Sequence, residues 1–256
     1  LCEASALALE AEVGLTMHMS PTESDPLSYL RRTGRRPLGH LADLGVLGEH
    51  LLIAHGVWLD DEEVELLLDT KTALAYCPWA YLRLGQGVSR VGRHAEIFER
   101  GGRVALGCDA ANAGDSIDIL KTAALAVGIA RDSRVDPTRF GAHEGLEMAT
   151  IAGAEAIGMA PRIGSLEVGK KADLVVFETT GISWIPRGDV VLQLVWGSDG
   201  RSVRDVVVGG RTILRDRSLT TVDIDQVRHS AQEAQQALLA RAGIAIPSRW
   251  PHVVSR

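Results

Sequence analysis

Four short apolar runs at regular intervals constrain the fold of this chain more than any other feature of its sequence. They begin at residues 15, 51, 73 and 104, so their mean spacing is about 30 residues. Each run is continuous rather than alternating, which is typical of strands buried on both faces of a parallel sheet. A (β/α)8 barrel of about 250 residues has roughly 31 residues in each strand–helix unit. The first half of the chain therefore predicts four consecutive barrel units, which is half of such a barrel.

Helical patterns lie before and between these runs. We expect helices over residues 2–10, 60–68, 91–100 and 143–158. The helix over 60–68 has Asp60 as a candidate N-cap and Glu63 three residues later, the spacing of a capping box. The alternation of apolar runs with helical patterns predicts an α/β fold.

Ionisable residues stand at the ends of three of the apolar runs. His18 lies near the end of the first run, His55 ends the second, and Asp109 follows the fourth. Active sites of (β/α)8 barrels form at the carboxyl ends of the strands. Two imidazoles and a carboxylate there suit a divalent metal such as zinc. A core histidine for each imidazole, and an Asx turn or helix cap for Asp109, are the alternatives.

The pattern changes after residue 160. We expect a turn and a strand over 163–177 and another strand over 190–196. Residues 203–208 and 211–214 flank Gly209–Gly210, a hairpin signal. An amphipathic helix is expected over 223–242. The predicted division is a barrel part over 1–160, a small β-sandwich segment over 161–222, and a helix with a tail over 223–256.

Composition excludes several classes of protein. The 256 residues carry 27 basic and 33 acidic side chains, a net charge of −6, and show no basic stripe of the kind that nucleic-acid binders have. No apolar run reaches the roughly 18 residues that a membrane span needs. Three widely spread cysteines, Cys2, Cys77 and Cys108, make a disulfide framework improbable. We therefore expect a cytoplasmic protein that binds neither nucleic acid nor membranes.

Five segments resemble sequence patterns of the amidohydrolase superfamily. Residues 104–110 resemble V-x-L-G-T-D-G, and residues 54–63 resemble H-x-x-x-L-(T/D)-x-x-E. Residues 77–85 resemble C-P-x-S-N-x-x-L-G, and residues 149–154 resemble A-T-x-x-G-A. Residues 164–175 match G-S-L-E-x-G-K-x-A-D-L-V almost letter for letter. The matches run in order over about residues 1–215 and most resemble the branch that holds guanine, cytosine and adenosine-type deaminases and the triazine hydrolases.

That resemblance implies a metal-dependent barrel with a small β-sandwich. It makes His18 a metal ligand on the fifth barrel strand, and Asp109 a metal ligand after the eighth strand that also takes a proton from the attacking water. His55, on the sixth strand, would polarise the substrate. The implied cofactor is one divalent ion, zinc with iron as the alternative. The implied reaction is hydrolytic removal of an amino group from a nitrogen heterocycle.

The chain departs from the family pattern at two places that matter for catalysis. Pro21 occupies the position of the glutamate in the branch's H-x-x-E motif, so Glu23 becomes a candidate proton shuttle, with a solvated loop charge as the alternative. Ala80–Tyr81 replaces the Ser–Asn pair, which makes Tyr81 a candidate substrate contact; Asn112, beyond Asp109, is another. The pattern therefore predicts no particular purine or pyrimidine as the substrate.

The family's first-strand H-x-H motif is missing. No two histidines are two residues apart, and His18 begins where the fifth strand would lie. The chain is therefore expected to be the C-terminal half of the barrel, inactive by itself, with exposed strand edges that favour pairing with another copy into a homo-oligomer. Rival interpretations are a hydrolase of cyclic amides or carbon–halogen bonds, and a non-catalytic scaffold. Five of the six remaining histidines are expected on surfaces or helices, namely His40, His94, His143, His229 and His252. Arg31, Arg32, Arg35 and Arg36 are expected on a solvated loop.

Overall fold

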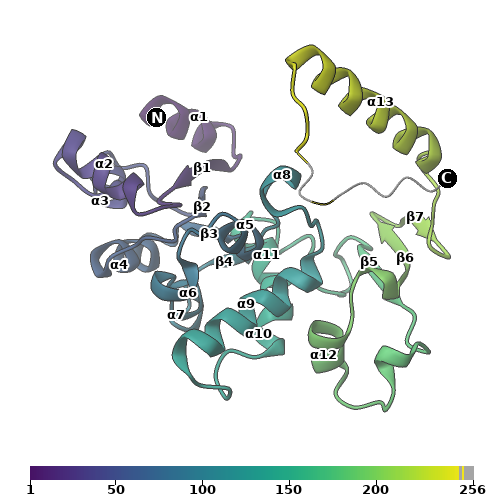
Figure 1. The fold of residues 1–256 in the computed structure, drawn as a ribbon. Helices are drawn as coiled ribbons and strands as arrows, with labels where there is room; N and C mark the ends of the chain where they lie inside the picture. The colour runs from purple at the N-terminus through teal and green to yellow at the C-terminus, as the bar shows by residue number, and fades with distance from the viewer. Residues whose placement is uncertain (248–249, 251–256) are drawn as a thin grey trace.

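The computed structural model describes residues 1–247 and 250, and its first half is built on a four-stranded parallel sheet (Figure 1). The strands are β1 (Leu15–Met19), β2 (Leu51–His55), β3 (Ala73–Tyr76) and β4 (Val104–Leu106), in the order β1-β2-β3-β4. All three neighbouring pairs are parallel. The predicted strand–helix units of a partial (β/α)8 barrel are confirmed.

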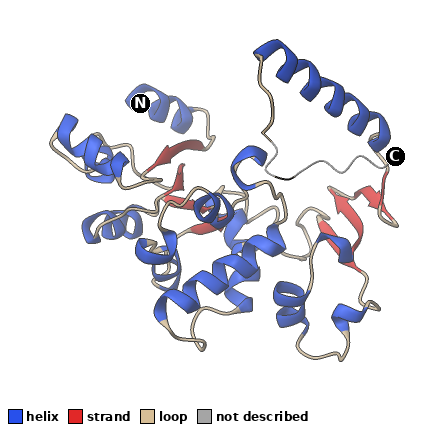
Figure 2. Cartoon of the chain, in the orientation of Figure 1, coloured by secondary structure: helices blue, strands red, loops and turns tan. Residues whose placement is uncertain are grey.

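Helices follow each strand and cover the sheet (Figure 2). In the barrel part they are α1 (Cys2–Glu10), α2 (Ser24–Thr33), α3 (Pro37–Asp43), α4 (Asp61–Thr70), α5 (Pro78–Arg83), α6 (Val88–Val91), α7 (His94–Glu99), α8 (Ala111–Gly114), α9 (Ile119–Arg134), α10 (Ala142–Met148) and α11 (Ile151–Ala156). The main core cluster lies between sheet and helices and includes Leu51, Ile53, Leu74 and Val104, all fully buried.

Helix α4 begins with the predicted capping box. The Asp60 carboxylate accepts from the Glu63 amide at 3.0 Å, and the Glu63 carboxylate accepts from the Asp60 amide at 3.3 Å. The buried Glu63 carboxylate also accepts from the Leu38 amide and from the Arg36 guanidinium. The prediction of a solvated basic loop was therefore wrong in part: its first two arginines lie in α2, and Arg36 is half-buried, where its ion pair links the start of α3 to α4.

Two expected helices are each interrupted. Residues 91–100 contain only the end of α6 and then α7, because Gly92 takes an extended conformation between them. Residues 143–158 contain α10 and α11, and Thr150 between them is not helical. The Thr150 hydroxyl donates to the Leu146 carbonyl at 2.7 Å and so closes the first of the two helices. In both cases the backbone ends the helix although apolar residues continue at helical spacing in the sequence.

The second half carries a four-stranded antiparallel sheet. Its strands are β5 (Leu174–Phe177), β6 (Val203–Val208), β7 (Arg211–Arg215) and β8 (Ser218–Leu219), in that order. The predicted hairpin turn is confirmed, since Gly209 and Gly210 join β6 to β7 with φ values of +57° and +78°. Two successive left-handed residues form the turn that matches the twist of paired strands, and glycine takes that conformation without strain.

The strand predicted over 190–196 is wrong. The chain forms α12 (Val190–Leu192) and a π-helical turn, η2 (Gln193–Gly197), between the 3-10 turns η1 (Ile182–Trp184) and η3 (Gly200–Ser202). The Asp189 side chain caps α12 by accepting from the Leu192 amide at 2.9 Å. Val195 is buried against Ala123 of α9, so the apolar run packs on a helix rather than in a sheet.

The predicted helix over 223–242 is confirmed as α13 (Ile224–Ala242). Asp223 caps it, and Gly243 ends it in the left-handed conformation. None of its residues is buried, so the predicted apolar face has no described partner, and Figure 1 shows α13 standing apart from the barrel part. The boundaries at residues 160 and 222 stay a prediction. Within the described residues no helix has the length and apolarity to cross a bilayer.

Candidate functional site

Three of the predicted site residues meet at the carboxyl end of the parallel sheet. His18 lies in β1, His55 is the last residue of β2, and Asp109 follows β4. The His18 and His55 ring centroids are 5.1 Å apart, with the rings tilted by 32°. His18 is exposed, whereas His55 is 6% exposed. The parallel sheet brings these residues to one edge, as barrel active sites require.

Both of the other groups affect the electrostatics of His55. Burial lowers the pKa of His55, the Asp109 carboxylate partly opposes that change, and His18 adds to it. The neutral imidazole is therefore favoured. Its Nδ1 atom is buried and has no hydrogen-bond partner in the described structure. A buried polar atom of this kind is expected to meet a ligand or water.

Asp109 is held in a strained turn beside β3. Its φ is +60°, an unusual value for a residue with a Cβ, and its carboxylate accepts from the Ala110 amide at 2.6 Å. Burial raises the pKa of the Cys77 thiol to about 12, and the Asp109 carboxylate adds to the rise. Asp109 therefore lies near both the end of β3 and His55. Strain at a polar residue in such a position is typical of functional sites.

The structure does not bring Glu23, Tyr81 and Asn112 together with this cluster in the same way. Glu23 is exposed at the start of α2, and Asn112 is exposed in α8. Tyr81 is fully buried; its hydroxyl donates to the Ala75 carbonyl at 3.2 Å and accepts from the Cys77 amide at 3.0 Å. Tyr81 packs edge-on to His55 at 5.6 Å. Tyr81 therefore packs against the His55 ring. The catalytic or substrate roles of Glu23, Tyr81 and Asn112 stay predictions.

Two residues near the site were not predicted to belong to it. Asp25 accepts from the Ser20 amide at 2.7 Å and raises the pKa of His55. The sequence signal that could have indicated Asp25 is an acidic residue in the first turn of a helix that follows a strand. His94 bonds to the His55 carbonyl. It was expected on a surface or a helix; it lies in α7 but is buried, a placement that its i, i+3 spacing to Ile97 could have indicated.

The donor types at this edge fit a borderline divalent metal, but their number is short of a full site. Imidazole and carboxylate suit zinc, which usually takes three protein ligands in a catalytic site. Within residues 1–247 and 250, no group of three or more His, Cys, Asp or Glu side chains is arranged to hold a metal ion. His18 and Asp109 can supply part of a ligand set, and the Nδ1 atom of His55 beside them makes no hydrogen bond within the described structure.

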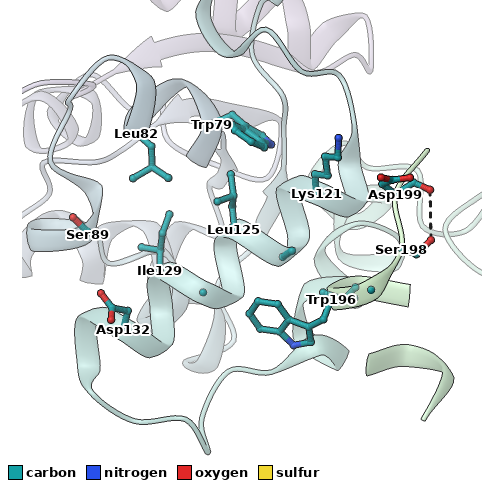
Figure 3. Close-up of a pocket in the computed structure, with 14 residues that line it drawn as sticks. Trp79, Leu82, Ser89, Lys121, Leu125, Ile129, Asp132, Trp196, Ser198 and Asp199 are labelled. Carbon is teal, nitrogen blue, oxygen red and sulfur yellow. Dashed lines mark hydrogen bonds between the residues drawn. The ribbon is translucent and has the colours of Figure 1, made fainter. Parts of the chain in front are cut away.

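A separate hollow of about 640 Å³ lies between α9 and η2 (Figure 3). Its floor is apolar, with Leu125 and Ile129 from α9 and Trp196 from η2. Lys121 and Asp199 stand at one end. None of the clustered histidines or Asp109 lines it. The candidate catalytic groups therefore lie at the carboxyl end of the parallel sheet and not in this hollow.

Comparison with known families identifies the class of protein. Residues 1–213 match the model of the amidohydrolase family, and the chain belongs to that family. A 5-methylthioadenosine/S-adenosylhomocysteine deaminase from Syntrophobacter fumaroxidans is 34% identical over 227 residues, which are 89% of this chain and 51% of that protein. A 5'-deoxyadenosine deaminase from Methanobrevibacter smithii is 28% identical over 91% of this chain and 53% of its own length.

Solved structures agree with this assignment. An adenosine deaminase from Xanthomonas campestris with bound zinc superposes with a TM-score of 0.89 at 26% identity, covering 93% of this chain and 54% of that one. An atrazine chlorohydrolase from Arthrobacter aurescens complexed with zinc shares the fold, with a TM-score of 0.81 at 24% identity over 90% of this chain and 50% of its own. The chain thus spans about half the length of the relatives it matches.

Proposed function

We propose that the protein containing this chain is a metal-dependent aminohydrolase that removes an amino group from a nitrogen heterocycle. The observation that carries the proposal is the meeting of His18, His55 and Asp109 at the carboxyl ends of parallel strands. The names of the relatives favour an adenosine-like substrate with a modified 5' position. The metal is proposed to be a single zinc ion, as in the titles of the solved relatives, with iron as the alternative.

The chain's own residues divide the work as follows. His18 and Asp109 would contribute ligands to the metal, together with side chains outside this chain. When bound, the metal lowers the pKa of a water molecule so that it can act as a nucleophile near neutral pH. The Asp109 carboxylate accepts the proton of the attacking water. The neutral His55 ring, buried and held by Tyr81, orients the substrate's electrophilic carbon.

Departure of an amino group requires a proton donor, and this is where the chain is least typical. Glu23 is the candidate shuttle, but it is exposed and Pro21 occupies the motif position. Asp25 is half-buried and its charge raises the pKa of His55, so it is a second candidate for the same role. A halide leaves without a proton. The exposed position of Glu23 therefore favours a carbon–halogen hydrolase as the second candidate function, with cyclic-amide hydrolysis and a non-catalytic scaffold behind it.

The test is an assay that distinguishes the leaving groups. The 256-residue chain, and the longest reading frame that contains it, are purified with zinc and offered 5'-deoxyadenosine, 5-methylthioadenosine, a chlorinated triazine and a hydantoin. Release of ammonia from the adenosines supports the proposal. Chloride release supports the second candidate, and ring opening of the hydantoin supports a cyclic amidase. Absence of turnover and of bound metal in both proteins supports a scaffold.

A cytoplasmic location and a homo-oligomeric state are part of the proposal. Cys2, Cys77 and Cys108 are free thiols, which suits a reducing compartment. In the part of the chain that the structure describes, strands β1 and β4 each have a neighbour on one side only, and unpaired edges favour association. Sedimentation of the purified protein measures the oligomeric state.

A further inference from the structure

The chain turns sharply where β2 ends, and this turn sets the direction of the His55 side chain. His55 has a φ of +83° and Gly56 a φ of +60°, so two consecutive residues are left-handed. That conformation is unfavourable for a residue with a Cβ and persists only where the surroundings hold it. The Gly56 amide donates to the Met19 carbonyl at 2.9 Å, which ties the turn to β1. The turn places the His55 ring beside His18.

The carbonyl of His55 receives a side-chain donor from another element. His94 Nε2, at the start of α7, lies 2.6 Å from this oxygen. A carbonyl oxygen only accepts, so Nε2 carries the proton and donates it. The bond therefore fixes the tautomer of His94, and Nδ1 keeps its lone pair. Nδ1 is buried and makes no hydrogen bond within the described structure, as that tautomer allows.

The His94 ring is itself immobilised by packing. Its exposed fraction is 2%, and it stacks on Tyr76 with ring centroids 4.1 Å apart and planes inclined by 11°. The ring centroid of Tyr81 lies 5.9 Å from that of His94 and 5.6 Å from that of His55. Burial lowers the pKa of His94 to about 4, which keeps the ring neutral. The same group of rings thus contacts both the carbonyl and the imidazole of His55.

We propose that His94 is a positioning residue, whose Nε2–H bond to the His55 carbonyl holds the left-handed turn that directs the His55 imidazole to the site shared with His18 and Asp109. The importance of that imidazole rests on the proposed function; the bond and its effect on the turn do not. The rival interpretation is that His94 only fills space beside Tyr76. In the first interpretation the N–H donor of His94 stabilises the turn at His55. In the second, only the volume of the His94 ring contributes, through packing.

Two substitutions separate the donor from the ring. His94→Phe keeps the stacked ring and removes the donor, whereas His94→Gln removes the ring and keeps an N–H donor at a similar distance from the backbone. His143→Gln, on the exposed face of α10, is the matched control. Hydrogen exchange is followed by NMR at the amides of Gly56 in the turn and Ile53 in the middle of β2.

We expect His94→Phe to raise the exchange rate of the Gly56 amide by about tenfold or more relative to Ile53, since the turn then opens locally without global unfolding. His94→Gln is expected to restore most of the protection, and His143→Gln to change nothing. If His94→Phe leaves Gly56 as protected as in the parent protein, His94 is a packing residue and the proposal is wrong.

A second measurement needs no variant and stands even if His94→Phe does not fold. Long-range ¹⁵N–¹H spectra of the histidine rings report which nitrogen is protonated. The proposal requires the Nε2–H tautomer for His94 with slow exchange of that proton. An Nδ1–H tautomer, or a rapidly exchanging Nε2 proton, overturns it. Neither readout depends on turnover, so loss of the proposed function would leave this result intact.

Discussion

The two sheets of the molecule differ in how fully they are buried. In the parallel sheet, Leu51, Ile53, Leu74 and Val104 are fully buried, and helices cover the strands. In the antiparallel sheet, every described strand residue is half-buried or exposed. The parallel sheet also carries His18, His55 and Asp109 at one end, whereas none of the candidate catalytic residues comes from the antiparallel sheet. The more deeply buried sheet is thus the one that carries the candidate catalytic residues.

This difference has a physical reason. A catalytic group must be held by neighbours whose own positions are fixed by packing, and of the two described sheets the parallel one offers such neighbours. His55 shows this directly, because Tyr81 packs against its ring and His94 bonds to its carbonyl. The antiparallel sheet and α13 expose apolar side chains such as Val208 and Val227.

The largest expected effect is on catalysis at the parallel sheet. Asp109→Asn removes the group that accepts the water proton and weakens a metal ligand, so kcat is expected to fall by about 10²–10⁴-fold. Ammonia release by the zinc-loaded longer protein measures it. Asp69→Asn, on the exposed side of α4, is the control and is expected to leave kcat unchanged. An Asp109→Asn enzyme with the parental kcat would contradict the proposal that the reaction takes place at the carboxyl end of the parallel sheet.

The next effect compares the stability of the two sheets. Leu51→Ala deletes a fully buried side chain in β2 and is expected to cost about 2–5 kcal/mol of unfolding free energy. Leu214→Ala makes the same truncation in β7, where the side chain is half-buried, and is expected to cost about 1 kcal/mol. Urea unfolding of both variants measures the difference. Equal losses would show that the second sheet is as tightly packed as the first.

Acid should act on the parallel sheet through His94. Burial lowers its pKa to about 4, below the ordinary histidine value of about 6.5. As the pH falls from 6.5 towards 4, the unfolded chain binds a proton that the folded chain refuses, so stability falls. The slope contributed by this residue is at most about 1.4 kcal/mol per pH unit. Urea unfolding at several pH values measures it, and His94→Gln should remove that share of the slope; an unchanged slope would contradict the buried neutral ring.

The smallest effect is expected in the antiparallel hairpin. Gly210 has a φ of +78° and open space around its Cα, so Gly210→Ala costs only the left-handed conformation, about 1 kcal/mol. Gly188→Ala is the control, because Gly188 is also uncrowded and its φ is not positive. Thermal unfolding compares the two variants. Equal midpoints would mean that the hairpin melts separately from the transition observed.

The sequence predicted the elements whose signals are local. The four apolar runs became parallel strands, Asp60 with Glu63 formed the capping box, and Gly209–Gly210 formed the hairpin turn. These signals depend on neighbours within a few residues. The convergence of His18, His55 and Asp109 also followed, because parallel strands end at one edge whatever their distance in sequence.

What failed depended on contacts that the sequence does not display. The apolar run over 190–196 became a helical turn because Val195 packs on α9. Arg36 is half-buried rather than fully solvated because it pairs with the buried carboxylate of Glu63. His94 looked like any helix residue, and only the fold brings it to the His55 carbonyl from 39 positions away. Long-range partners of polar groups were thus the part that residue patterns could not supply.

The most direct test of the central claim is the zinc content of the protein at the parallel sheet. The longest reading frame that contains the chain is purified with zinc and compared with its His18→Ala variant, with His143→Ala as the control. We predict about one zinc ion per chain in the parent and the control and far less in His18→Ala. Equal zinc in all three proteins would contradict a metal site at the carboxyl end of this sheet.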